Sequence, residues 1–252
     1  MRSDRGLALA AAPMLLLLAL PLAGLLAGAQ PAAWSSAWEH PLWAPALGLS
    51  LRTSTMSVLV IVVLGTPAAW WLSQRDRHPA WQAVVDLPMV LPPAVIGLAL
   101  LVSMSPDGLL GKASGWVFST GAVVLAQVVV AAPFYLSAAC AAFRRVDVEL
   151  VWVARSLGLD PVRVFFKVTL PLAAPGIFVG VGMAWARALG EFGATIFVAG
   201  NLPGVSQTMP LAIYTVMESS LSVALSLAMA LVLCALAVLG LLRALARAWG
   251  VS

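Results

Sequence analysis

Six long apolar runs constrain the fold of this chain more than any other feature of its sequence. They cover residues 7–28, 46–72, 84–104, 116–143, 172–199 and 221–242. Each run is close to or above the roughly 20 apolar residues that a helix needs to cross the hydrocarbon core of a bilayer. Inside a bilayer every backbone polar group must find its partner within the chain, so we expect helices. The sequence therefore predicts an all-α integral membrane protein with about six transmembrane helices.

Composition supports a membrane protein over a soluble one. Charged residues make up 10% of the chain, whereas a soluble domain carries about a quarter. The net charge of +4 does not indicate nucleic-acid binding, because the basic residues fall in short loops between apolar runs. The cysteines Cys140 and Cys234 lie inside apolar runs, and neither has a Cys or His at metal-ligand spacing. We expect membrane lipid as a partner, and no metal, cofactor or nucleic acid.

The first apolar run has features of a secretory signal, since Arg2 and Arg5 precede it and small residues follow at 27–29. The apolar part of a signal peptide is only about 7–15 residues long. The greater length of this run favours an uncleaved first helix, with cleavage as the alternative. Residues 1–45 are then an N-terminal transmembrane helix followed by an extracytoplasmic loop.

The basic residues predict the orientation in the membrane. With six crossings, one side carries Arg2, Arg5, Arg75, Arg77, Arg144, Arg145, Arg155, Arg163, Lys167, Arg243 and Arg247. The opposite side keeps Lys112 and, near the start of the second run, Arg52. Lys and Arg are enriched in cytoplasmic loops, so both termini and the segment 144–170 are expected in the cytoplasm.

The segment 144–171 is the one substantial cytoplasmic loop, and its residues predict two short helices joined by a tight turn. Gly158 can adopt the left-handed conformation that ends a helix. Asp160 is a preferred N-cap residue for the next helix. Leu170-Pro171 is expected to stop that helix and to start the next span. From the residues alone, this segment is either an amphipathic linker on the membrane surface or a docking element for a cytoplasmic partner.

The stretch VELVWVARSLGLDPVRVFFKVTLPL (148–172) resembles the cytoplasmic motif of ABC-importer permeases. That motif has Glu-x-Ala-Ala, a Gly seven residues after the Glu, and Leu-Pro about a dozen residues later. The residues that match are Ala154, Gly158, Leu170 and Pro171. The register places Val151 where the family has Glu, and Glu149 is a candidate to replace part of the lost polarity. The resemblance implies that 144–171, including Asp160, is an ATPase-coupling loop.

Two further stretches are similar to molybdate and sulfate permeases: DLPMVLPPAVIGLALL (86–101) and WARALGEFGATIFVAGNLPGVSQTMPLAIYTVMES (185–219). The second is most similar to the molybdate branch. The resemblance implies the type I ABC-importer permease fold, with 46–252 as the permease domain in a bacterial inner membrane. It also implies the function of this domain, which is to form the oxyanion pathway of an ATP-driven molybdate importer. The implied partners are a second permease copy, cytoplasmic ABC ATPase subunits and an extracytoplasmic molybdate-binding protein. A sulfate or tungstate permease is the alternative.

The chain itself is not expected to hydrolyse ATP. Its nearest phosphate-loop candidate, at 108–113, lacks the first Gly of that motif and a Ser or Thr after Lys112. A carrier driven by an ion gradient is a second alternative, but such proteins commonly carry intramembrane acids or internal repeats. Glu191 is the only central acid, and the two halves show no convincing repeat.

Two groups of residues within the spans are candidates for the transport pathway or a gate. Arg187 and Glu191 are the charged residues deepest in a span, where a charge costs about 2.5–3.5 kcal/mol. Their four-residue spacing places them on one helix face, so they either border the anion pathway or form a structural ion pair. Pro92, Pro93 and Gly97 either break the third span and expose backbone groups to a cavity, or produce a simple kink.

Polar residues also gather in the outer loop of the family-like segment. These are Asn201, Ser206, Gln207 and Thr208. Loop side chains of this kind either contact a partner, here the binding protein that the resemblance implies, or are only solvated. Both interpretations predict that they are exposed.

Overall fold

The computed structural model describes residues 2–28, 38–74 and 79–248, which form helices and no strand. Arg75 and Arg77, used above for orientation, lie outside these described residues. The helices are α1 (Arg2–Gly28), α3 (Trp43–Ser73), α4 (Pro79–Val90), α5 (Pro93–Met104), η1 (Gly111–Trp116), α6 (Thr120–Arg144), α7 (Val148–Ser156), α8 (Pro161–Val164), η2 (Phe165–Thr169), α9 (Leu170–Leu189), α10 (Gly193–Ala199), α11 (Met209–Met217) and α12 (Leu221–Ala248). The all-α prediction is confirmed.

The number of spans agrees with the expectation of about six. Among the described residues, five helices are long and apolar enough to cross a membrane. A sixth candidate is the pair α4 and α5, which bends by 110° between Val90 and Pro93. Pro92 and Pro93 have no N–H to continue the helical hydrogen bonds, so the chain turns sharply here. The third apolar run is therefore interrupted, as in a broken span or a re-entrant loop, and a simple kink is excluded.

The fifth span differs from the prediction at both of its ends. A single apolar helix runs over Pro161–Leu189, through η2 and into α9. The expectation that Leu170-Pro171 ends the preceding helix is thus wrong. The η2 turn is a π-helix in which the N–H of Leu170 donates to the carbonyl of Phe165, five residues back. This wider turn precedes Pro171, and the helix passes through the position where a donor is missing.

At its other end this helix stops at Leu189, although the apolar run extends to residue 199. Gly190 closes α9 through its N–H, which donates to the carbonyl of Ala186, and α10 begins at Gly193. The fifth apolar run therefore contains one long helix, a turn and one short helix.

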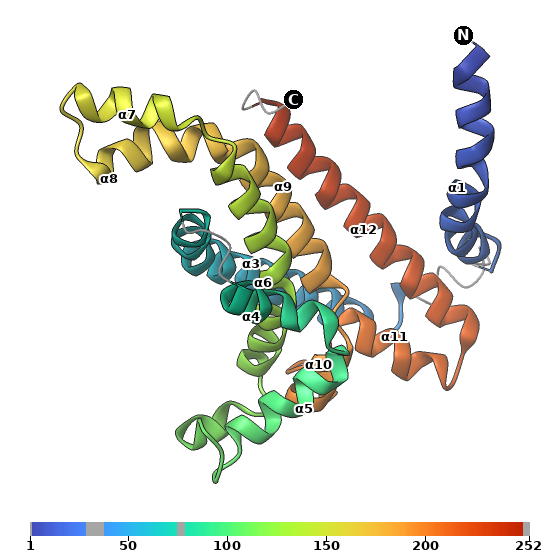
Figure 1. Cartoon of the computed structure of the whole chain (residues 1–252). Coiled ribbons are helices and arrows are strands. Elements are labelled where there is room, and N and C mark those ends of the chain that lie inside the picture. Colours follow the sequence, from blue (N-terminus) through green and yellow to red (C-terminus); the bar gives the residue numbers. More distant parts are fainter. Residues whose placement is uncertain (1, 29–37, 75–78, 249–252) are drawn as a thin grey trace.

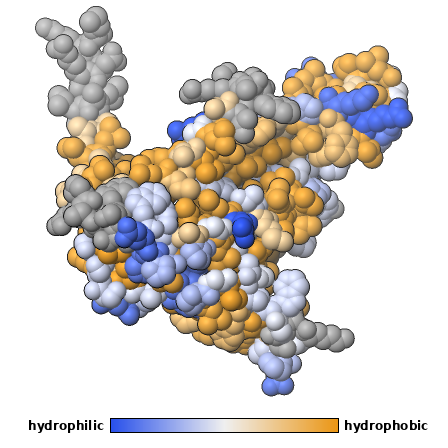
Figure 2. Space-filling view, turned by 180° about the vertical axis from the view of Figure 1, so that it is seen from behind, coloured by the Kyte–Doolittle hydropathy of each residue, from blue (hydrophilic) through white to orange (hydrophobic). Residues whose placement is uncertain are grey.

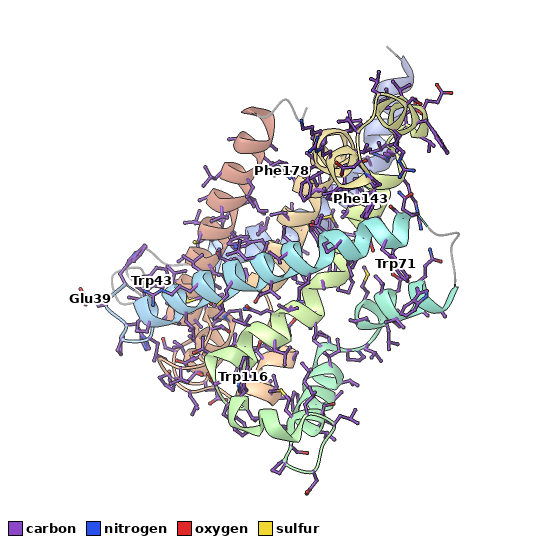
Figure 3. The ribbon with its side chains drawn as sticks, turned by 90° about the vertical axis from the view of Figure 1, so that its left-hand side faces the viewer. Glu39, Trp43, Trp71, Trp116, Phe143 and Phe178 are labelled. Carbon is purple, nitrogen blue, oxygen red and sulfur yellow. The ribbon has the colours of Figure 1, made fainter. Side chains whose placement is uncertain are left out.

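The centre of the molecule is α6, which packs against α3 on one side and α9 on the other (Figure 1). Small residues permit the close approach of α9. A Cβ added to Gly176 would lie 2.5 Å from the Cβ of Ala142, and one on Gly180 would lie 3.1 Å from the Cβ of Ala138. This arrangement is the small-residue packing expected of membrane helices. In Figure 3, α3 extends from Trp43 near one end to Trp71 near the other.

The surface matches a protein embedded in lipid. Figure 2 shows hydrophobic residues over much of the visible face, with one hydrophilic patch on the projecting end that α7 and α8 form and others at the lower left and the bottom. Large exposed apolar side chains are numerous on α1, α3 and α12, for example Leu16, Val63 and Leu236. In water such exposure would be unfavourable, whereas lipid tails provide an apolar environment for these side chains.

Candidate functional site

The two broken spans meet where α5 and α10 begin. A Cβ added to Gly97 would lie 2.5 Å from the carbonyl oxygen of Ala194, and one on Gly193 would lie 3.0 Å from the Cβ of Pro93. The breaks in the third and fifth spans are therefore neighbours, although the sequence separates them widely. Non-helical backbone within a membrane protein is tolerated where it is buried in protein or lines a cavity.

Glu191 fixes the turn between α9 and α10. One carboxylate oxygen, Oε1, accepts a hydrogen bond of 2.7 Å from the N–H of Ala194, and so caps the first turn of α10. The other oxygen, Oε2, lies 2.7 Å from Nη1 of Arg187. These two atoms form an ion pair, but the geometry of the contact is not that of a hydrogen bond. The proposed pairing of these two residues is thereby confirmed.

The two partners differ in exposure. The Glu191 side chain is 1% exposed, whereas that of Arg187 is 26% exposed. The carboxylate is thus a buried fixed element that stabilises the turn, which is the structural interpretation of the pair. The guanidinium remains partly accessible, so the hypothesis that Arg187 borders the pathway stays a prediction.

The loop formed by α7 and α8 has the caps and the turn that its sequence predicts. Asp147 caps α7 by accepting from the N–H of Glu149 at 2.9 Å. Gly158 has φ +86°, in the left-handed region, and follows the end of α7. Asp160 caps α8 by accepting from the N–H groups of Val162 and Arg163, each at 3.0 Å. The local turn chemistry thus sets the angle between the two short helices.

The residues of the family motif have different positions in this loop. Ala154 is 5% exposed and packs inward. Val151 is half-buried and lines a pocket between α7 and the membrane helices, whereas Glu149 is exposed and does not line it. Leu170 and Pro171 lie within the continuous helix rather than at its start. Glu149 therefore does not supply a carboxylate to the place where the family Glu would point.

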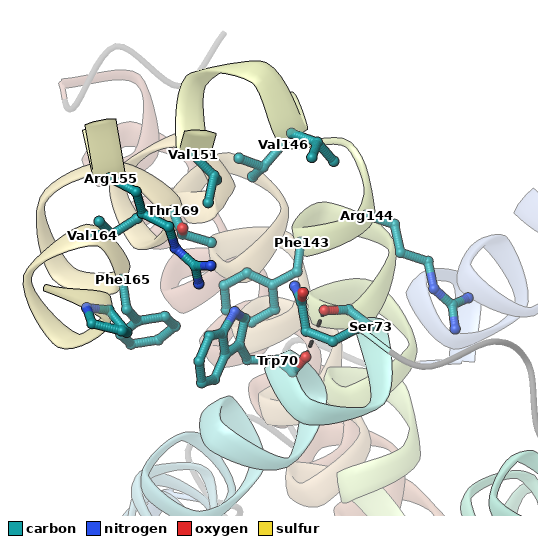
Figure 4. Close-up of a pocket in the computed structure, with 13 residues that line it drawn as sticks. Trp70, Ser73, Phe143, Arg144, Val146, Val151, Arg155, Val164, Phe165 and Thr169 are labelled. Atoms are coloured by element: carbon teal, nitrogen blue, oxygen red, sulfur yellow. Dashed lines mark hydrogen bonds between the residues drawn. The ribbon is translucent and has the colours of Figure 1, made fainter. Parts of the chain in front are cut away.

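The pocket behind Val151 is a cavity of about 300 Å³ (Figure 4). Its aromatic part is a cluster in which the rings of Trp70 and Phe165 lie 4.9 Å apart and those of Phe143 and Phe165 lie 6.0 Å apart. Arg155 extends from α7 toward these rings. The cavity thus joins the end of α3, the end of α6 and the loop formed by α7 and α8 in one site.

A polar face of α3 was not identified from the sequence. Ser50, Thr53, Ser54 and Ser57 recur at helical spacing and are all buried. Ser57 donates to Oε1 of Gln127 on α6 at 2.9 Å, and Ser50 accepts from the N–H of Met209 at 2.7 Å. The spacing of four small hydroxyl residues within an apolar run was the signal that could have revealed this helix contact.

The loop between α10 and α11 contradicts the expectation from the sequence. Ser206, Gln207 and Thr208 are 0%, 3% and 0% exposed, so they are neither solvated nor presented to a partner. The amides of Asn201 and Gln207 both donate to the hydroxyl of Thr215 on α11, at 2.9 and 3.4 Å. The prediction of exposure is wrong for these three residues, because the end of the loop packs inward before α11, whereas Asn201 is half-buried and residues 202–205 are exposed.

Comparison with known proteins agrees with this architecture. Residues 61–251 match the family described as "Binding-protein-dependent transport system inner membrane component". The molybdenum transport system permease protein ModB of Escherichia coli K12 is 43% identical over 188 residues, covering 71% of this chain and 81% of the relative. ModB of Mycobacterium tuberculosis H37Rv is 42% identical over 219 residues, covering 82% and 83%.

Solved structures show the same fold at low sequence identity. A bacterial ABC transporter for import of the polysaccharide alginate has a chain with TM-score 0.76 and 17% identity, covering 98% of this chain and 96% of that chain. The MetNI methionine ABC transporter in an inward-facing conformation gives TM-score 0.67 and 17% identity, covering 82% and 96%. The expected type I ABC-importer permease fold is confirmed. With a family match over most of its length, the chain belongs to the inner-membrane components of binding-protein-dependent transport systems.

Proposed function

We propose that this chain is the permease subunit of an ATP-driven molybdate importer. The observation that carries the proposal is the 37–43% identity with several proteins named molybdenum transport permeases, over roughly 70% to 80% of this chain. The broken helices α5 and α10 support a transport role, because discontinuous helices commonly surround the substrate sites of transporters.

The complete importer contains two copies of this permease, two cytoplasmic ATPase subunits and an extracytoplasmic molybdate-binding protein. The related alginate transporter was solved in complex with a substrate-bound periplasmic protein, which supports a binding protein as partner. Both termini and the loop formed by α7 and α8 face the cytoplasm. Exposed arginines on that loop, namely Arg144, Arg145, Arg155 and Arg163, support this orientation.

Coupling runs along the continuous helix Pro161–Leu189. ATP binding closes the ATPase dimer and moves the two copies of the α7–α8 loop together. Because the helix is uninterrupted, this motion reaches the turn at Glu191, which is joined to the start of α10. The contact of α10 with α5 then transmits the motion to the interruption between α4 and α5. Alternating access follows as a two-state rearrangement around these breaks.

Reconstitution tests the proposal. The permease, its neighbouring ATPase and its neighbouring binding protein are placed in liposomes, and ATP hydrolysis and anion uptake are measured with molybdate, tungstate and sulfate. Molybdate-loaded binding protein is expected to stimulate hydrolysis, and omission of the permease is expected to abolish the stimulation.

The outcomes separate the alternatives. If sulfate or tungstate stimulates ATP hydrolysis and molybdate does not, the substrate assignment is wrong but the protein is still an ATP-driven importer. Uptake that follows an ion gradient and does not require the ATPase contradicts the proposal and favours a secondary carrier.

A further inference from the structure

The cavity behind Val151 is positively charged. Among the residues that the structure describes, thirteen line it, and the charged ones of these are the two arginines Arg144 and Arg155. In Figure 4, Arg155 extends toward the aromatic rings, whereas Arg144 extends to the other side of the site. Nη2 of Arg144 donates a long hydrogen bond of 3.5 Å to the carbonyl of Leu72. Arg155 is therefore the cation directed at the interior of the cavity.

Arg155 differs in its contacts from Arg163, the arginine at the start of α8. Within the residues that the structure describes, it makes neither an ion pair nor a hydrogen bond. By contrast, the neighbouring Arg163 lies 3.0 Å from a carboxylate oxygen of Asp160. An arginine that is unpaired beside an apolar wall is available to an external anion.

The position of Val151 explains this lack of a partner. It lies four residues before Arg155, and both line the cavity. A Glu at 151, as the family motif has it, would precede the arginine in the favourable order for an ion pair across one helical turn. Valine removes that carboxylate, and Glu149 does not line the cavity. The motif position that carries a glutamate in the family is the neutral Val151 here, and the charged group that this part of α7 presents to the cavity is the Arg155 guanidinium.

The dimensions and the walls limit what can bind. A volume of about 300 Å³ is at the lower end of the range for small-ligand pockets, so it suits one side chain better than a cofactor. The rings of Trp70, Phe143 and Phe165 form an apolar wall beside Arg155. Partial exclusion of water strengthens an ion pair with the guanidinium.

We infer that this cavity receives an acidic side chain of the cytoplasmic ATPase subunit, with Arg155 as its ion-pair partner. The coupling contact thus has the opposite charge polarity at this position from that of the family motif. The inference rests on the proposed function, because it requires an ATPase that docks on the α7–α8 loop. Arg155 is exposed on that loop and is accessible to such a partner.

The affinity of the ATPase for the permease in neutral detergent tests the inference. Arg155→Gln is compared with Arg163→Gln, a matched arginine in the same loop that does not line the cavity. Arg155→Gln is expected to weaken binding at least about tenfold, and Arg163→Gln less than about threefold. Arg155→Lys keeps the charge and is expected to recover most of the affinity. Equal effects of the two glutamine variants would overturn the inference.

Val151→Glu gives a test of opposite sign. This variant restores the family motif, yet it should weaken ATPase binding, because the new carboxylate pairs with Arg155 and repels the incoming acid. If Val151 is simply a lost coupling residue, the same variant tightens binding and the inference fails. The thermal denaturation midpoint of each variant, measured without the ATPase, separates loss of docking from loss of folding.

Charge reversal identifies the partner residue. Binding lost in Arg155→Glu should return when one acidic surface residue of the ATPase is changed to Lys, and a complete scan without such a rescue contradicts the inference. Weaker binding of Arg155→Gln to anionic-lipid vesicles, with unchanged ATPase affinity, would assign the cavity to a lipid headgroup instead. A wild-type permease that binds no ATPase at all would refute the proposed function itself, which is a distinct result.

Discussion

Gly97 of α5 and Ala194 of α10 approach so closely that a Cβ on Gly97 would lie 2.5 Å from the carbonyl oxygen of Ala194 and 2.7 Å from its Cα. Both atoms belong to the backbone of α10 and cannot move aside as a flexible side chain would. This contact joins the broken third span to the broken fifth span. It places the two interruptions of the membrane helices side by side.

Gly97→Ala is expected to destabilise the protein by about 1–3 kcal/mol, the usual cost of overpacking. It should also reduce transport, since the added methyl group pushes α5 and α10 apart and disturbs the contact that transmits the motion between them. The matched control is Gly182→Ala in α9, where the nearest atom to an added Cβ is 4.0 Å away. This control is expected to be neutral or slightly stabilising, because alanine favours helix over glycine. Thermal unfolding in detergent measures both, and equal midpoints would contradict the close contact.

Replacing Arg187 alone should lower the stability of the protein more than replacing both Arg187 and Glu191. Arg187→Gln leaves a buried carboxylate uncompensated, which typically costs about 3–5 kcal/mol. The double variant Arg187→Gln/Glu191→Gln removes that charge, and we expect it to be more stable than Arg187→Gln alone. Thermal unfolding of both single variants and the double variant gives the coupling energy. Additive effects would show that the pair is not energetically coupled.

Transport by Arg187→Lys distinguishes the two roles of Arg187. A lysine keeps the positive charge but loses the planar guanidinium. If Arg187 borders the anion pathway, we expect altered uptake in a variant that retains normal stability and assembly. Wild-type uptake by a stably assembled Arg187→Ala variant would exclude the pathway role and leave only the structural one.

ATPase affinity should be highest with the native Gly158, lower in Gly158→Asn and lowest in Gly158→Ala. The φ of +86° at this position costs an ordinary L-residue roughly 1–2 kcal/mol, whereas no atom lies within 4 Å of an added Cβ. The effect is therefore conformational and not steric, and Asn is the residue that tolerates this region best after Gly. ATPase affinity of the three proteins measures the ranking. Gly48→Ala, which also has open space around the new Cβ, is the control.

Ser50→Ala should destabilise the membrane domain by about 1–3 kcal/mol, because it leaves the buried N–H of Met209 without an acceptor. Ser226→Ala is the control. Ser226 is equally buried, but its hydroxyl only donates to the carbonyl of Ser222 in its own helix. Thermal unfolding is the measurement, and the prediction fails if the two variants unfold at the same temperature.

Local features of the fold could be predicted from the sequence because they depend on chemistry within a few residues. The apolar runs have the length of a bilayer crossing, so they predict the membrane spans without any knowledge of how the helices pack. Gly158 and Asp160 form their turn with immediate neighbours, and the structure has both as predicted. Leu170-Pro171 is the local exception, since a π turn carried the helix through a proline that usually ends one.

The sequence by itself determined the membrane class, the approximate positions of the apolar spans and the turn between α7 and α8, because apolar length and capping act over short distances. Only the tertiary structure decided which breaks adjoin, as at Gly97 and Ala194, and that Ser206, Gln207 and Thr208 point inward. It also decided that Arg155 and Val151 face an aromatic wall from α3, α6 and η2. These relationships depend on contacts between residues far apart in the chain, and neither hydropathy nor turn chemistry encodes which helices pack together.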